Sequence, residues 1–401
     1  MTKRRQFGIA VVLIVAAVAA GARPASRWWL RHTRDELSAK CRAARDSQQW
    51  DDLQRLSADW AARDGGLADP WLFLAQVAEA RSDWSAVVDN LAHIPETDPK
   101  ALPALVEQAK LEFGPLNAPL AGEAACQKLL RLEPRATFAH QRLIQYYAIS
   151  LQREKLVRQI RAAIDAEREP PEAYVYLLLL DTLRMSNGVE LNQHWLMSHP
   201  QEEVFAVARA VQIPEPTDDK AAVPPDQLEA VRQAIAGKLE LVEALLAKYP
   251  TNLELLAYKI EQCITVGETD QVVDLLSRVS ESAEADSRFW RFKGWLHETY
   301  DELTEAEAAY KQALEIHPLD WSSWNRLAVV YRRMKNVQEV TRLTGLVEAA
   351  QSLRKRIRLL PTAEQVTPEI LADLAKYASN CGARWLAEPL ERRVRQIVVS
   401  E

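Results

Sequence analysis

The side chains that could do chemistry do not occur at any of the spacings that common catalytic sites require. Motifs of phosphate-binding loops, dinucleotide sites, nucleophile elbows and zinc-protease helices (G-x-x-x-x-G-K-[ST], G-x-G-x-x-G, G-x-S-x-G and H-E-x-x-H) are all missing from the sequence. His194 and His199 are five residues apart, so a helix would place them on different faces, and Pro200 follows directly. We therefore expect no catalytic, metal-binding or cofactor-binding residues, and we predict that the protein is not an enzyme.

The four cysteines give no sign of redox or metal chemistry either. Cys41, Cys126, Cys263 and Cys381 are scattered, and no two of them form a C-x-x-C pair. The first three fall where two helices would pack together, and a free cysteine behaves there as a small apolar residue. We expect them to be buried packing residues.

The chain must therefore be understood from the elements that position its side chains, and residues 287–324 are the most informative stretch. Large, small and helix-ending residues recur here at the spacing of two antiparallel helices. They are Trp290, Gly294, Ala306, Tyr310, Ala313 and Pro318. The pattern then restarts, because Trp324 lies 34 residues beyond Trp290. The small residues let two helices approach, and the proline ends the second helix. One hairpin cannot bury its apolar face alone, so several must stack.

These residues resemble the tetratricopeptide repeat (TPR), whose signature runs W-x2-L-G-x2-Y, A-x3-F and P. The match here reads Trp290-x2-Lys293-Gly294-x2-His297, Ala306-x3-Tyr310 and Pro318. Lys293 and His297 depart from the signature, and the next repeat restores both positions with Trp324-x2-Leu327-Ala328-x2-Tyr331. The resemblance implies an all-α superhelix, a solenoid of helical hairpins. The chain also resembles membrane-anchored bacterial TPR proteins that assist complex assembly.

The repeat extends over most of the chain and suggests its domain organisation. It begins near Asp35, since Trp50 precedes Trp84 by 34 residues. Residues 213–225, IPEPTDDKAAVPP, are rich in proline and acid without a helical period, which is typical of a linker. We therefore predict a basic and apolar segment at 1–34, a degenerate TPR-like array at 35–212, the linker, and a TPR array with C-terminal capping helices at 226–401.

In TPR proteins the first helices of successive hairpins line a concave groove that holds a partner peptide. The resemblance implies that the groove-facing positions here include Arg288, Arg291, Trp295, Asn325 and Arg332. Arginines beside an exposed tryptophan would suit an acidic segment or a C-terminal carboxylate. The family's two-carboxylate clamp is not matched, because the preceding repeat has glutamates, Glu254 and Glu261, at equivalent places. A solvated face without a specific ligand is the alternative.

A basic stretch at 326–358 stands out in a chain whose formal net charge is −6. Its members are Arg326, Arg332, Arg333, Lys335, Arg342, Arg354, Lys355, Arg356 and Arg358. They could contact nucleic acid or anionic lipid, or form a solvated helix face. No aromatic stacking pattern accompanies them, so we expect no nucleic-acid partner.

The N-terminus has the composition of a membrane segment. Lys3–Arg5 precede an apolar run at 7–22, which as a helix would reach about 24 Å, slightly less than the ~30 Å hydrocarbon core. Trp28–Trp29 could extend the span to the interface. A cleavable signal peptide is the alternative, because Ala20-Gly21-Ala22 is an acceptable cleavage site, although Arg23 follows it directly. We favour a single-pass anchor. The short preceding tail slightly favours an exported or periplasmic solenoid over a cytoplasmic one.

The sequence thus predicts a non-catalytic, membrane-tethered TPR protein that mediates protein–protein interaction or complex assembly. A protein or peptide partner is expected in the concave groove, and the membrane is expected to be contacted through residues 7–22. Two alternatives stay open. One is a non-catalytic subunit or substrate arm of an enzyme, and the other is a nucleic-acid or anionic-lipid surface binder that uses the basic stretch.

Overall fold

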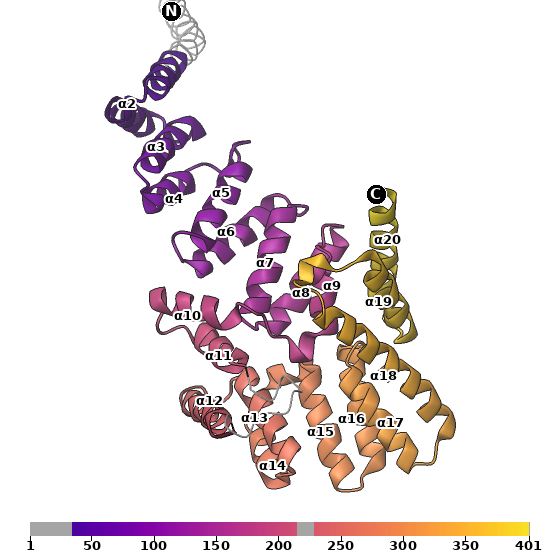
Figure 1. Ribbon diagram of the computed structural model, residues 1–401. Coiled ribbons are helices and arrows are strands. Elements are labelled where there is room, and N and C mark those ends of the chain that lie inside the picture. The colour runs from indigo at the N-terminus through magenta and orange to yellow at the C-terminus, as the bar shows by residue number, and fades with distance from the viewer. Residues whose placement is uncertain (1–33, 215–227, 401) are drawn as a thin grey trace, which may run out of the picture. The chain divides into compact units, whose positions relative to one another are not determined.

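The computed structural model describes residues 34–214 and 228–400, and every regular element within these two ranges is a helix (Figure 1). The all-α prediction is therefore confirmed. The apolar run at 7–22 lies outside the described residues, as does most of the predicted linker at 213–225. The chain divides by its internal contacts into two compact units, Met1–Glu133 and Pro134–Glu401. The predicted domain boundaries at 34 and 213–225 stay predictions.

The first unit consists of consecutive antiparallel helices. They are a helix at 34–46, α2 (Trp50–Arg63), α3 (Ala68–Ala80), α4 (Trp84–Ala92), α5 (Ala101–Phe113) and α6 (Pro119–Leu132). Trp60 and Cys41 are buried in the core that α2 and α3 share, as small and large residues of a hairpin should be. At Gly122 an added Cβ would lie 2.7 Å from the Phe113 ring, so only glycine permits this approach of α6 to α5.

The second unit continues the hairpins and ends in a long helix pair. Its α-helices are α7 (Thr137–Ile149), α8 (Arg153–Asp165), α9 (Glu172–Leu178), α10 (Gly188–Ser198), α11 (Glu203–Gln212), α12 (Leu228–Lys248), α13 (Leu253–Val266), α14 (Thr269–Ser277), α15 (Ser287–Thr299), α16 (Leu303–Ile316), α17 (Trp321–Arg333), α18 (Val337–Arg358), α19 (Pro368–Asn380) and α20 (Arg384–Ser400). Short 3-10 helices are η1 (Leu180–Thr182), η3 (Glu281–Ala285) and η4 (Ala363–Gln365).

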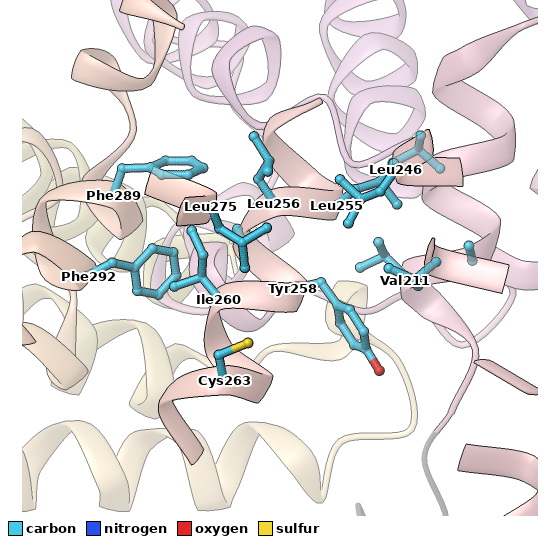
Figure 2. Packing of buried hydrophobic residues seen from close by; sticks show 14 of the residues in the cluster. Val211, Leu246, Leu255, Leu256, Tyr258, Ile260, Cys263, Leu275, Phe289 and Phe292 are labelled. Carbon is cyan, nitrogen blue, oxygen red and sulfur yellow. The ribbon is translucent and has the colours of Figure 1, made fainter. Parts of the chain in front are cut away.

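The hairpin of α15 and α16 has the packing that its sequence predicts. An added Cβ at Gly294 would lie 2.7 Å from the Tyr310 ring, so the two helices meet where α15 has no side chain. Tyr310 and Ala306 are fully buried against it. The core continues from α11 through α13 to α15, and Figure 2 shows Cys263 of α13 among its apolar residues, with Phe292 of α15 close by. A row of shared cores is what stacked hairpins require.

The tryptophans at the repeat position have a second function that the pattern did not predict. Trp71, Trp290 and Trp324 are partly buried, and each donates its indole N–H to a backbone carbonyl six residues earlier. The N–H···O distances are 2.9 Å, 3.0 Å and 2.9 Å. These tryptophans therefore also fix the turn that leads into their own helix, in both units.

Candidate interaction surface of the second unit

Two of the three arginines predicted to meet a partner, Arg288 and Arg291, are buried in ion pairs. Arg288 is 4% exposed and lies between two carboxylates, with Nη2–O distances of 2.6 Å to Asp286 and 2.5 Å to Glu254. Asp286 also caps the N-terminus of α15 by accepting the backbone N–H of Arg288. Burial alone would raise the pKa of Asp286, but the Arg288 charge outweighs it and lowers that pKa. Arg288 is thus fully occupied within the chain.

Arg291, one turn further along α15, bonds to a segment more than 100 residues earlier. Its Nη1 donates to Asp181 of η1 and, at 2.7 Å, to Asp320, the N-cap of α17. Its Nη2 lies 3.3 Å from Glu261. Desolvation would raise the pKa of Asp181, but the nearby positive charges, Arg291 foremost, lower it well below its usual range. The charge of Arg291 therefore favours the ionised form of Asp181.

The same short segment is held from a second side by α18. Arg354 donates an N–H to the Thr182 hydroxyl at 3.2 Å, and its guanidinium lies 5.1 Å from the centre of the Trp321 ring. The neighbouring helix α9 is buried on all sides, as its uninterrupted apolar sequence predicts. The 3-10 helix η4 contacts α9. Asp181 of η1 thus contacts an arginine of α15 that the resemblance assigned to a partner.

The other three predicted positions are placed differently. Trp295 is partly buried and packs against the core that α13 and α15 share, whereas Asn325 and Arg332 of α17 are exposed. The structure therefore brings Arg288 and Arg291 together around acidic residues, and leaves Asn325 and Arg332 at the surface. A role in partner binding for the predicted set stays a prediction.

A cavity of about 1040 Å³ is lined in part by the paired carboxylates Asp181, Glu254 and Asp286, and sequence reasoning did not find it. It is bounded by the first half of α8, by η1, and by the N-terminal ends of α11, α13 and α15. Aliphatic side chains form much of its lining. They are Leu151, Val157, Leu177, Leu180, Val204, Val207, Leu253 and Ile316. Their presence makes the cavity suitable for burying apolar groups.

The α8 wall of this cavity carries arginines whose donors are not all used. Arg153 is 10% exposed and bonds Glu254 through Nε at 2.9 Å, yet its Nη1 has no hydrogen-bond partner among the described residues. The guanidinium of Arg161 lies 4.6 Å from the ring centre of Trp385, which is 37% exposed. Arg158 is exposed, and its closest approach to Glu154 is 3.6 Å. An arginine stacked on a tryptophan keeps its in-plane N–H groups available for a carboxylate.

Carboxylates also line the cavity. Glu202 and Glu203 stand at the start of α11, and Glu315 lies near the end of α16. Glu203 accepts a hydrogen bond of 2.7 Å from the side-chain amide of Asn252, which carries no charge. Carboxylates at a helix N-terminus interact favourably with the helix dipole, as Glu202 and Glu203 do at the start of α11. The cavity lining thus carries both arginines and carboxylates.

Sequence alignment to the TPR signature could not point to this cavity. The signature directs attention to the first helices of the matching repeats. The arginines that line the cavity lie instead on α8, in a region of weak resemblance. The run R-E-K-L-V-R-Q-I-R of α8 does show cations three and five residues apart, which was the one available signal. The partner Trp385 is more than 220 residues away in sequence, and nothing local predicts it.

Four of the nine cations in the basic stretch of α17 and α18 lie within 4 Å of a carboxylate among the described residues. Arg333 pairs with Asp301, Arg342 with Glu339 and Arg356 with Asp373. Arg326 lies 3.9 Å from Glu298. These pairs reduce the attraction of the stretch to phosphates, since each phosphate contact needs an available cation.

Among the described residues, no group of three or more histidine, cysteine, aspartate or glutamate side chains could hold a metal ion. Within the same residues no helix combines the length and the apolar character needed to cross a bilayer.

Comparisons with known proteins agree with the repeat. A tetratricopeptide repeat family model matches residues 309–340. No curated protein matches the sequence. Similar solved structures include the Cut9–Hcn1 hetero-tetramer of APC/C, at 13% identity, TM-score 0.32, and coverage of 91% of this chain and 79% of that one. Another is the human IFIT1 dimer with PPP-AAAA, at 11% identity, TM-score 0.32, and coverage of 89% and 76%. A TPR-type repeat is thus shown at residues 309–340, within a chain whose described regular elements are all helices.

Proposed function

We propose that this protein is a non-catalytic interaction scaffold that holds a segment of a partner protein in the cavity between α8 and the N-terminal ends of α11, α13 and α15. The observation that supports it most is the cavity itself, about 1040 Å³ in volume, with an aliphatic lining and charged walls. Repeat solenoids use such concave surfaces to bind other chains. The paired cations of α17 and α18 make the nucleic-acid or lipid alternative less favourable.

Site-specific crosslinking tests this function. A photoreactive amino acid at Val157, which lines the cavity, should capture a partner in cells that express the full chain. The same amino acid at Glu305, exposed on α16 and not a cavity residue, is the matched control. Equal adducts at both positions, or none at Val157, would contradict a partner in the cavity.

We further propose that residues 7–22 tether the scaffold to a membrane, with the exported side favoured for the helical units. The apolar run behind Lys3–Arg5 supports this proposal. The full chain should stay with membranes after alkaline extraction, whereas a chain that begins at Asp35 should be released. N-terminal sequencing distinguishes an anchor from a cleaved signal peptide, and labelling of a surface cysteine in intact cells reports the side.

A further inference from the structure

We infer that the cavity recognises a peptide segment of mixed charge, with an acidic side chain at the arginines of α8, apolar side chains against the aliphatic lining and a basic side chain at the carboxylates of α11 and α16. This inference rests on the proposed function, and it adds the chemistry of the partner. The occupant is a partner polypeptide.

The α8 wall supplies the site for the acidic group. Arg161 presents a guanidinium that lies 4.6 Å from the centre of the Trp385 ring, and the N–H groups of a guanidinium can form two parallel bonds to one carboxylate. Arg153 adds a nine-tenths buried guanidinium whose Nη1 lacks an acceptor among the described residues. Buried polar groups in folded proteins almost always have a hydrogen-bond partner, so an incoming carboxylate oxygen would satisfy this one.

The carboxylates of the lining disfavour a wholly acidic partner. Glu202 and Glu315 line the cavity, and Glu203 is bonded only to the neutral Asn252 amide in the described contacts. A second carboxylate on the ligand would meet like charge at these residues, whereas a lysine or arginine would meet opposite charge. The phosphates of a nucleic acid would suffer the same repulsion.

The lining of the cavity suits a polypeptide. Its volume of about 1040 Å³ lies at the upper end of the roughly 300–1,000 Å³ that sites for small ligands enclose, and it is open to solvent. Leu177, Val204 and Leu253 lie in its lining together with the charged residues. A segment that carries apolar as well as charged residues matches this lining.

Selection from a random 12-residue peptide library on the immobilised full chain tests the inference. The enriched peptides should carry an acidic residue, a basic residue and apolar residues. Binding of the best fluorescein-labelled peptide, followed by anisotropy, should weaken at least about tenfold in Arg161→Glu, since a charged hydrogen bond is lost and a repulsion gained. The variant should in turn prefer the same peptide with lysine in place of its acidic residue.

Arg63→Glu is the matched control, because Arg63 is exposed at the end of α2 in the other unit and undergoes the same charge change. Its peptide affinity should not change. Arg161→Lys should bind with intermediate affinity, because lysine keeps the charge but loses the planar fork. Circular dichroism of each variant checks that the helices are intact.

The inference is overturned if no peptide is selected, if the selected peptides lack an acidic residue, or if Arg161→Glu binds them as wild type does. In those cases crosslinking from Val157 would still report whether the cavity holds a partner. The inferred charge pattern of the peptide and the proposed scaffold function can therefore be refuted separately.

Discussion

Two sets of arginines in the second unit differ in their surroundings. Those of α15 are paired with carboxylates, whereas those of α8 line a cavity. Arg288 and Arg291 of α15 sit where a TPR groove would face a partner, yet both are buried and paired with carboxylates. Arg158 and Arg161 of α8 lie in a region of weak repeat resemblance, yet they face an open cavity. The difference teaches that position in a repeat does not make a charge available. What decides is whether another part of the chain has already satisfied that charge.

The largest effect on stability is expected when an ion pair of Arg291 is removed. Arg291→Leu leaves Asp181 and Asp320 buried without their shared cation, which should destabilise the second unit by about 3–5 kcal/mol. Because the chain has two compact units, the measurement is native-state hydrogen exchange of amides in α15 and α17. A loss confined to partner binding, with exchange unchanged, would show that Arg291 is not a structural residue.

A buried acid without a cation should behave in the opposite way to Asp181. Glu112 of α5 is 7% exposed, its Oε2 lacks a partner among the described residues, and burial raises its pKa to about 7. Since the folded state holds this proton more tightly than the unfolded state, stability should fall as pH rises from about 4.5 to 7. The full penalty above pH 7 is about 3 kcal/mol.

Glu112→Gln should remove this penalty and make the exchange of amides in α5 and α6 slower at pH 8 but little changed at pH 4. Glu107→Gln on the same helix is the control, because Glu107 is half exposed and pairs with Lys110. Identical pH profiles for wild type and Glu112→Gln would refute the buried-acid assignment.

Two glycine substitutions should change the stability of the second unit by smaller amounts and in opposite directions. Gly294→Ala places a methyl group against the Tyr310 ring and should destabilise the second unit by about 1–3 kcal/mol. Gly345→Ala, in an exposed part of α18 with nothing within 4 Å, should stabilise it by about 0.5–1 kcal/mol. Hydrogen exchange in α16 and α18 reports both changes, and equal signs would contradict the close contact of α15 with α16.

The smallest effect on stability is expected for the arginines of α8. Arg161→Ala removes a stacked surface side chain and should cost at most about 1 kcal/mol. The same change should nevertheless weaken binding of the selected peptides. A large loss of stability would mean that Arg161 belongs with the paired arginines of α15 and not with a binding surface.

Much of the fold could be predicted from local spacing. Trp290, Gly294, Tyr310 and Pro318 predict one hairpin, and the restart at Trp324 predicts its neighbour, because each contact is made within a repeat or with the next one. Even one pair of the buried network follows this rule, since Glu254 and Arg288 are 34 residues apart and bond across adjacent repeats. Charges in register between repeats can be found by sequence alone.

The amino-acid sequence by itself determined that this protein is built of stacked helical hairpins, since side-chain periodicity acts over a few turns of helix. Only the tertiary structure decided which charges are available. Arg291 meets Asp181 across 110 residues and Arg153 meets Glu254 across 101, contacts that exist only because the second unit brings distant helices together. The same long-range packing left the arginines of α8 beside an open cavity, and no local pattern encodes that outcome.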